Sequence, residues 1–356
     1  MLPRRALMLD RARLMRRFAA GDTWFDSSPL YQVLARSVAD SDELLDLAAQ
    51  VRPGPQPANM LMAATHLIVL RHPEHPFARF FPSVRGDDAE PPAAAAAEFA
   101  DFCAEHRAAI SEILRTRLVQ TNEPGRGVSV RLAMHEVARR VGGPVTFLEV
   151  GPSAGIQLRF DDWALEMAGR RFGPAAAPVT LRPEWRSAHP PPDLDDLPPI
   201  RQRLGVDLSP VDATDPEERL WLQALVWPEH RDRRARLAAA LDAIAACPPT
   251  ILQGDAIDLL PALDASRLAD DIPLVVFHAM VRVHIPPERR DAFDGAIRDL
   301  GRRRRLLHVS LEIPPQGSRY DRAAHLLALH DSAGSDADLA LAEGHGRWIQ
   351  PLITAP

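Results

Sequence analysis

The sequence predicts an α/β protein with a Rossmann-like, doubly wound, mostly parallel sheet that follows an all-helical N-terminal part. Residues 1–140 show helical periodicity, and no clear strand pattern precedes residue 144. From residue 144 onward, short β-type apolar runs alternate with helical segments, which is typical of parallel sheets. A Pro-rich, irregular stretch around residues 170–200 interrupts the alternation. We therefore divide the chain into a helical domain, residues 1–140, and a sheet domain, residues 141–356, with an irregular insertion around 170–200.

Several helices of the first domain are marked by the residues at their starts. Ser28 and Ser41 are suitable N-caps because a serine side chain can accept a hydrogen bond from the first helical turn. Residues 59–71 are apolar on every side, which favours a buried helix, so we interpret His66 within it as a core residue. Residues 98–120 form one long amphipathic pattern, which predicts a single helix.

The second domain is expected to begin with a strand over residues 144–150 and a helix over residues 154–169. One strand is expected within residues 178–185. In the C-terminal tail, polar turns separate two or three short β-like runs. Further strands are predicted near Asp207 and over residues 249–256, 272–280 and 304–313, and further helices over residues 214–226, 231–246, 256–267 and 286–302.

Composition and charge argue against several classes of function. The 356 residues carry 42 basic and 48 acidic side chains, a net charge of −6, which does not favour binding to nucleic acid or to an anionic membrane. No run of about 18 apolar residues indicates a membrane span. The Arg-rich N-terminus lacks the apolar core of a secretory signal, so we expect a cytoplasmic protein. Cys103 and Cys247 are interpreted as free thiols, no metal is predicted, and the oligomeric state is left open.

Residues 146–158, TFLEVGPSAGIQL, contain the motif on which the functional interpretation depends. In the form G-x-S-x-G, the motif would be a nucleophile elbow presenting Ser153, with Asp255 and His345 completing a Ser–Asp–His order. That interpretation needs strands before the elbow, whereas helical segments precede it here. In the form acid-x-Gly-x-x-x-Gly, the motif is the first loop of a nucleotide-binding sheet. The second form suits a first strand better.

Acidic residues near the ends of the following strands extend this motif. Asp207 is placed to accept hydrogen bonds from ribose hydroxyls, and Asp255 could accept one from a base amino group or cap the next helix. In this order of residues the second domain resembles the class I S-adenosylmethionine-dependent methyltransferases. That family has an acidic residue with a glycine loop, then a ribose-binding acid, and then an Asp near the adenine. The resemblance implies S-adenosylmethionine as cofactor, bound by Glu149, Gly151, Ser153, Gly155, Asp207 and Asp255.

The sequence departs from that family's pattern in two places. Ser153 replaces the middle glycine of the loop, and we interpret it as a hydrogen-bond donor to the cofactor or the backbone. Asp207 follows Gly151 by 56 residues, where doubly wound nucleotide-binding domains have about 20. Either residues 170–200 are an insertion, or a residue within them, and not Asp207, is the ribose-binding acid.

Polar residues before the first strand and histidines beyond it complete the candidate site. The candidate substrate contacts, in the stretch LVQTNEPGR, are Gln120, Asn122 and Arg126. The catalytic candidates are His278, Glu123 and His345. Each has a structural alternative: the stretch could be a helix end capped by Gly125, His278 could lie in the core, and His345 could belong to a turn.

Seven segments span nearly the whole chain: SPLYQVLARSVADSDELLDL, NMLMAATHLIVL, RLVQTNEPGR, LEVGPSAGIQL, RLGVDLSPVDATDPEERLWLQALVWPEHRDR, ILQGDAIDLLP and EGHGRW. In these segments the chain resembles the bacterial domain of unknown function 2332 family. The resemblance implies a helical part followed by a Rossmann-like part, and it implies no activity.

Together, these features predict an S-adenosylmethionine-binding, methyltransferase-like protein that acts on an unidentified small-molecule acceptor, with the helical domain as lid and substrate wall. One alternative is a non-catalytic protein that binds a nucleotide metabolite. Another is a serine hydrolase that uses the GPSAG turn. Whether the protein is an enzyme is left open.

Overall fold

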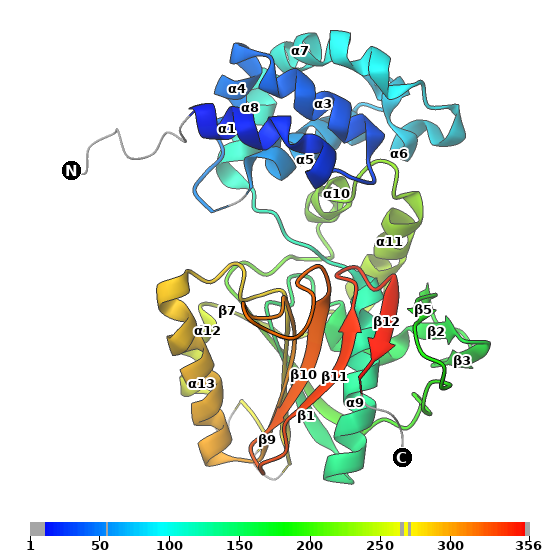
Figure 1. Ribbon diagram of the computed structural model, residues 1–356, viewed down its shortest axis with the longest axis vertical. Coiled ribbons are helices and arrows are strands. Elements are labelled where there is room, and N and C mark those ends of the chain that lie inside the picture. Colours follow the sequence, from blue (N-terminus) through cyan, green and yellow to red (C-terminus); the bar gives the residue numbers. More distant parts are fainter. Residues whose placement is uncertain (1–10, 55, 264–266, 270–271, 353–356) are drawn as a thin grey trace. The chain divides into compact units, whose positions relative to one another are not determined.

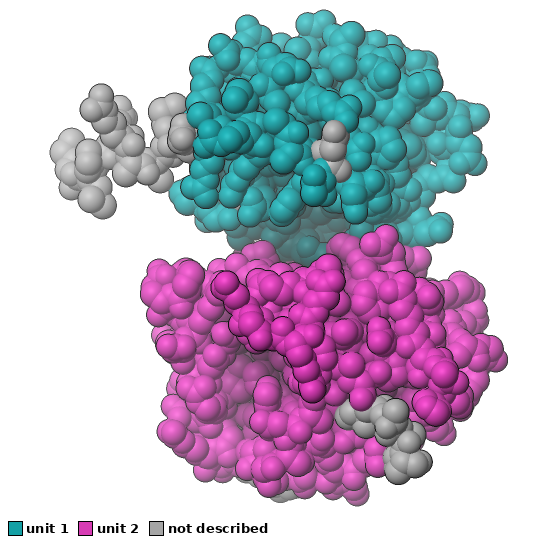
Figure 2. Space-filling view, in the orientation of Figure 1, with its two compact units in different colours: residues 1–121, 215–235 teal, residues 122–214, 236–356 magenta. Residues whose placement is uncertain are grey.

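The computed structural model describes residues 11–54, 56–263, 267–269 and 272–352, which fold into two compact units (Figure 2). Unit 1 comprises residues 1–121 and 215–235, and unit 2 comprises residues 122–214 and 236–356. The chain thus leaves unit 1 before residue 140, and it returns to that unit for one later segment. Residues 1–10, part of the N-terminus in which we expect no signal, lie outside the described residues.

Within the described residues, every secondary-structure element of unit 1 is a helix. The α-helices are α1 (Arg11–Ala19), α2 (Gly21–Trp24), α3 (Pro29–Ala39), α4 (Asp42–Ala48), α5 (Pro57–Arg71), α6 (Pro82–Arg85), α7 (Ala95–Glu105), α8 (Arg107–Thr116), α10 (Pro216–Ala224) and the first turn of α11 (Arg231–Ala246). The short 3₁₀ helices are η2 (Pro76–Phe80), η3 (Gly86–Asp88) and η4 (Pro92–Ala94).

Local sequence signals explain how several of these helices begin and what they bury. The predicted caps are confirmed: the Ser28 side chain accepts from the Tyr31 N–H at 3.2 Å, and the Ser41 side chain accepts from Leu44 at 3.3 Å. Helix α5 is buried along nearly its whole length. His66 on α5 is a core residue as predicted, since its ring nitrogens lie 3.0 Å from the Ala224 carbonyl and 2.7 Å from a serine hydroxyl.

The prediction of one helix over residues 98–120 is wrong. Helices α7 and α8 share this segment, and His106 separates them with φ −98° and ψ 16°, outside the helical region. The break lets α7 pack against α3, while α8 packs against α5. Residues 117–120 follow α8 without helical structure.

Unit 2 is built on one large sheet, and its α/β class is confirmed (Figure 1). The nine strands lie in the order β5-β12-β11-β10-β9-β8-β1-β6-β7. Strands β7, β6, β1, β8 and β9 pair in parallel, whereas β10, β11 and β12 continue the sheet as an antiparallel meander. The strands are β1 (Val145–Val150), β5 (Glu184–Trp185), β6 (Ile200–Asp207), β7 (Ile251–Gln253), β8 (Leu274–Ala279), β9 (Leu306–Glu312), β10 (His325–Asp331), β11 (Ala337–Ala342) and β12 (Trp348–Pro351).

Helices cover both faces of the sheet. Helices α12 (Ala256–Ala262) and α13 (Arg290–Arg303) pack together on one face, where Leu148, Val276 and Phe293 belong to one buried cluster. Helix α9 (Gly127–Val141) lies on the other side of the sheet, against β9, β10 and β11 (Figure 1). Of the helix predicted over residues 256–267, residues 264–266 lie outside the described residues. No helix in the described ranges has the length and apolarity needed to span a membrane.

The helix predicted over residues 154–169 is wrong. After β1 the chain forms a turn and the short 3₁₀ helix η6 (Gln157–Asp162), and then a second sheet in the order β3-β2-β4. A two-residue hairpin turn explains the difference, because Ala168 and Gly169 both have positive φ, 50° and 73°, as a type I′ turn requires. This sheet consists of β2 (Ala164–Met167), β3 (Arg170–Phe172) and β4 (Thr180–Leu181).

Candidate functional site

The carboxyl ends of the parallel strands meet at one edge of the large sheet, which we call the carboxyl edge. Glu149 lies near the end of β1, and Asp207, His278 and Glu312 lie at or near the ends of β6, β8 and β9. Because β10 runs antiparallel to β9, its first residue, His325, lies at the same edge. The β11–β12 connection, residues 343–347, also lies at this edge. The structure therefore collects most of the predicted site residues in unit 2, whereas Gln120 belongs to unit 1.

The loop after β1 has the backbone that its sequence predicts. Gly151, Ser153 and Gly155 all have positive φ, at 74°, 53° and 83°, and the serine is the unusual member because it carries a side chain. Asp207 holds this loop: one carboxylate oxygen accepts from the Ser153 N–H at 2.8 Å, and the other accepts from Ser209 at 2.8 Å. The predicted ribose-binding acid thus supports the loop directly.

Asn122 fixes the same loop from its other side. Its amide nitrogen donates to the Ser153 hydroxyl at 2.7 Å, and its amide oxygen accepts from the Ala154 N–H at 3.0 Å. Within the described residues, the Ser153 hydroxyl has this amide, and no histidine, as its hydrogen-bond partner. A nucleophilic serine needs a base within hydrogen-bond reach, which this arrangement does not supply.

Glu149 is buried beneath the loop in an environment that favours its neutral form. Burial raises the pKa of Glu149 to about 8, and the nearby charge of Asp207 adds to that effect. Arg126 and a backbone hydrogen bond from Leu158 act in the opposite direction. In the described part of the chain, Oε2 of Glu149 is buried without a hydrogen-bond partner. A buried polar atom of this kind needs explanation, because leaving it unsatisfied costs about 1–3 kcal/mol.

The motifs NEPGR, residues 122–126, and EGHGR, residues 343–347, meet at the carboxyl edge. Their backbones are so close that a Cβ on Gly125 would lie 2.1 Å from the His345 carbonyl oxygen, and a Cβ on Gly346 would lie 2.1 Å from the Gly125 carbonyl oxygen. Arg126 donates from Nε to the Gly344 carbonyl at 3.0 Å. The two glycines therefore bring Arg126 and the residues around it into one buried cluster.

Two predicted catalytic candidates lie side by side in this cluster. Glu123, which is buried, lies 3.6 Å from Nδ1 of His345. Glu123 also accepts through Oε1 from the Gly125 N–H at 3.0 Å, so its carboxylate helps to shape the turn. The backbone N–H groups of His345 and Arg347 bind Glu343 at 3.0 and 3.1 Å. The EGHGR motif is thus a turn that also brings the His345 side chain close to Glu123 at the carboxyl edge.

His278 belongs to a chain of polar groups that links the adjacent strands β8 and β9. Its Nδ1 lies 2.8 Å from Oε1 of Glu312, and its Nε2 lies 2.9 Å from Nε2 of His308. The same Glu312 oxygen accepts from the N–H groups of Val281 and Arg282, at 2.8 and 3.1 Å. Burial lowers the pKa of His308 well below its usual value, and the charge of His278 contributes. His278 therefore has partners at both ring nitrogens.

Asp255 has a structural role at the end of β7. It accepts from the Ile257 N–H at 2.9 Å as the N-cap of α12, and its other oxygen lies 2.8 Å from Arg289. The capping role considered from the sequence is therefore present. Both carboxylate oxygens are engaged away from Ser153, so the order Ser153–Asp255–His345 does not form a triad here.

Sequence reasoning missed Glu312, His308, His325 and Glu343. Glu312 carried a usable signal, because it is an acidic residue at the end of the apolar run LLHVSLEI, where parallel strands place binding groups. The other three have no distinctive spacing. His325 joins the edge only through the antiparallel pairing of β10 with β9, and Glu343 joins it only through the turn after β11.

A family of uncharacterised proteins conserved in bacteria, DUF2332, matches residues 12–350. The chain belongs to this family. The match covers both units, so the resemblance found in the seven sequence segments is confirmed. None of the curated proteins matches the chain.

Proposed function

We propose that unit 2 binds a nucleoside-containing small molecule of the S-adenosylmethionine type at the carboxyl edge, and that the protein is methyltransferase-like. The sheet supports a Rossmann-like assignment. Numbered along the chain, the five parallel strands lie in the order 3-2-1-4-5, and the order reverses between β1 and β8. Ligands of doubly wound sheets bind outside the carboxyl ends of the strands at this switch point. Glu149 on β1 and His278 on β8 flank that position.

The observation that carries the proposal is the buried Oε2 of Glu149 without a hydrogen-bond partner among the described residues. A neutral carboxyl group can both donate and accept a hydrogen bond. An amino or hydroxyl group of a ligand would satisfy it at the switch point. The orphaned atom lies on the first strand, next to the glycine loop, which is where nucleotide cofactors approach the backbone.

The other predicted contacts fit such a ligand in part. Each oxygen of Asp207 accepts one backbone N–H and keeps a second lone pair that could accept from a ribose hydroxyl. Arg126, close to Glu149, would bind a ligand carboxylate. A helix N-terminus after the glycine loop could bind an anionic group of the ligand. Here η6 contains the non-helical Arg159 and offers no regular helix N-terminus, so the positive charge of Arg126 would take that role. When bound, S-adenosylmethionine would supply the methyl group.

A non-catalytic binding protein is the second candidate, and the partners of the polar side chains favour it. The Ser153 hydroxyl is held by Asn122, and His278 has partners at both ring nitrogens. Neither is arranged as a general base. The serine-hydrolase alternative is weaker still, since Asp255 pairs with Arg289.

Isothermal titration calorimetry of the full chain tests the proposal, with S-adenosylmethionine, S-adenosylhomocysteine and adenosine as ligands. We expect binding of the first two, weakened at least about tenfold by Glu149→Leu, which removes both hydrogen-bonding oxygens; a tenfold loss corresponds to about 1.4 kcal/mol. The exposed Glu184, paired with Arg186, provides the control Glu184→Leu, which should leave affinity unchanged. Absence of heat up to about 1 mM ligand would contradict the proposal. Transfer of a labelled methyl group to an acceptor would separate an enzyme from a binding protein.

A further inference from the structure

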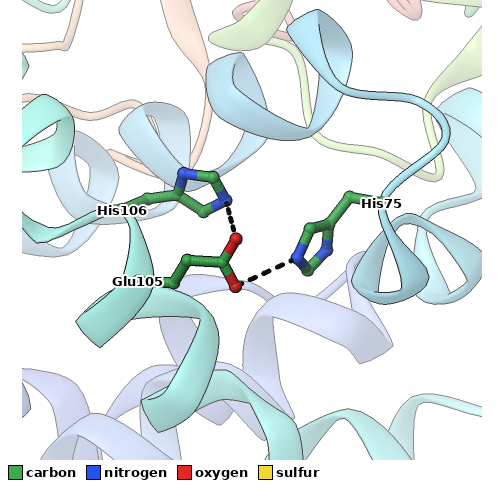
Figure 3. A group of neighbouring side chains, drawn as sticks. All are labelled: His75, Glu105 and His106. Carbon is green, nitrogen blue, oxygen red and sulfur yellow. Dashed lines mark hydrogen bonds and ion pairs between the residues drawn. The ribbon is translucent and has the colours of Figure 1, made fainter.

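Three side chains in unit 1 converge at a place where the sequence predicts no site. His75 caps η2, Glu105 ends α7, and His106 is the residue that separates α7 from α8. Nε2 of His75 lies 3.4 Å from one oxygen of Glu105, and Nε2 of His106 lies 3.8 Å from the other. One ligand atom from each residue lies within 4.8 Å of the other two. Figure 3 shows the two rings directed at the carboxylate from different sides.

One of these atoms is buried without a partner. Nε2 of His106 has no hydrogen-bond partner within the described residues, because its 3.8 Å separation from Glu105 is too long for a hydrogen bond. The His106 side chain as a whole is 18% exposed. This unsatisfied imidazole nitrogen is directed toward a carboxylate and a second imidazole. Together the three groups resemble a metal-ligand set.

Packing holds both rings in place. Phe102 contacts the His75 ring edge-on, with centroids 5.1 Å apart, and contacts the His106 ring at 4.7 Å. His72 stacks on the His106 ring, with centroids 5.8 Å apart. Phe102 is itself part of the buried core of unit 1. Since aromatic contacts hold both imidazoles, little side-chain entropy remains to be lost when a ligand binds.

We propose that His75, Glu105 and His106 bind a zinc ion. Two imidazole nitrogens and one carboxylate oxygen form an established set of three protein ligands for zinc, with the fourth position open to water. Magnesium and calcium prefer sites made entirely of oxygen ligands, so the two histidines argue against them. This site is independent of the ligand proposed for unit 2.

Zinc binding requires a change in the protonation of His75. Nδ1 of His75 accepts from the Phe77 N–H at 3.0 Å, so Nε2 carries the proton in the metal-free form and faces Glu105. For Nε2 to bind zinc, its proton must leave and Nδ1 must take one up, with no net change in the charge of His75. Nδ1 then no longer accepts from Phe77. The loss of this hydrogen bond opposes zinc binding and releases the Phe77 amide.

Zinc titration of the chelator-treated full chain by calorimetry tests the site. We expect one zinc ion to bind with a higher affinity than the remaining sites, and His106→Gln and Glu105→Gln each to weaken that binding at least about tenfold. His72→Gln should leave it within about threefold, because His72 stacks on the cluster without belonging to the ligand set. Glu105 is 61% exposed, so its variant tests the site even if His106→Gln fails to fold.

Hydrogen exchange supplies the second readout. Zinc should accelerate exchange of the Phe77 amide in the wild-type chain and not in Glu105→Gln. Equal zinc affinity in the wild-type and Glu105→Gln chains would overturn the proposal, as would zinc binding that leaves Phe77 exchange unchanged. No saturable binding below about 1 mM zinc would also overturn it.

Discussion

The ends of strands β1 and β9 place the same residue type in opposite electrostatic states. Glu149 and Glu312 are both buried, at 4% and 8% exposure, and both lie at the carboxyl edge of unit 2. Burial raises the pKa of Glu149 to about 8, so this carboxyl group is mostly neutral at pH 7. Burial also acts to raise the pKa of Glu312, but hydrogen bonds from His278, Arg282 and Val281 outweigh it and hold the pKa below its usual value.

The comparison shows that donors decide the charge of a buried carboxyl group. Three groups donate to one oxygen of Glu312, from a histidine ring and two backbone N–H groups of the loop after β8. For Glu149, the influences that favour the ionised form are a backbone hydrogen bond and the charge of Arg126. The charge of Asp207 favours the neutral form. Burial removes water from a carboxylate and raises its pKa. Hydrogen bonds donated to the ionised form can compensate this effect and lower the pKa again. At the β9 end, three donors thus satisfy Oε1 of Glu312, although its Oε2 is buried without a partner among the described residues, like Oε2 of Glu149. The β1 end lacks such a set of donors and is suited to an added donor or acceptor.

The largest expected effect is a change in the pH dependence of stability when Glu149 is replaced by Gln. The usual pKa of this carboxyl group is 4.5, and folding raises it to about 8, so the folded state holds an extra proton between these values. The free energy of unfolding should therefore fall as pH rises through this window, by about 1.4 kcal/mol per pH unit. The Gln side chain in Glu149→Gln does not titrate. The free energy of unfolding of this variant, relative to the wild type, should therefore rise with pH at the same rate.

Urea unfolding between pH 5 and 9 measures this difference, with hydrogen exchange of β1 amides reporting on unit 2 separately. The control is Glu184→Gln, which should unfold in parallel with the wild type at every pH, since Glu184 is exposed. Parallel curves for Glu149→Gln and the wild type would show that Glu149 is ionised in the folded state.

Replacing Glu312 should have a smaller effect of opposite sign. Glu312→Gln removes the charge that three donors share, and we expect the free energy of unfolding at pH 7 to fall by about 3 kcal/mol. The wild-type advantage should be complete above the unfolded pKa, about 4.5, and should disappear as pH falls through the lower folded pKa.

Urea unfolding checks the loss, and hydrogen exchange of the Val281 and Arg282 amides locates it. Glu288 is exposed and follows the same loop in the sequence. It supplies the control Glu288→Gln, which should change the free energy of unfolding by less than about 0.5 kcal/mol. If Glu312→Gln left the exchange of both amides unaltered, the charge of Glu312 would not be what holds the loop.

The sequence predicts the strands of unit 2 better than the connections between them. Apolar runs such as residues 272–280 and 304–313 are buried, so periodicity alone locates β8 and β9. The segment after Gly155 mixes apolar and charged residues in a helix-like pattern, but a hairpin turn at Ala168–Gly169 makes part of it a small sheet. Turn conformation depends on backbone φ at two residues, which the pattern of apolar residues does not encode.

The candidate site shows the same division between local and long-range information. Glu149, Gly151 and Asp207 each lie at or just after the end of an apolar run that predicts a strand. The structure brings them together because these two strands, β1 and β6, are adjacent and parallel. Glu312 and the 343–347 turn reach the same edge only through the order of the strands. The zinc ligands in unit 1 were missed because about thirty residues separate His75 from Glu105, and a helix break positions His106.

The smallest expected effects come from the two charges beside Glu149, which should move its pKa in opposite directions. Arg126 lowers this pKa and Asp207 raises it, so Arg126→Gln should raise it further and Asp207→Asn should lower it, each by about one unit. Arg126→Lys is the matched control, because it keeps the positive charge while changing the contact with Gly344. Carbon-13 NMR titration of glutamate side-chain carboxyl groups, assigned with Glu149→Gln, measures each shift. Asparagine at position 207 keeps an oxygen that can accept from Ser153, so the loop should persist while the charge is lost. Shifts of the same sign in both variants would mean that altered burial, and not the two neighbouring charges, controls the ionisation of Glu149.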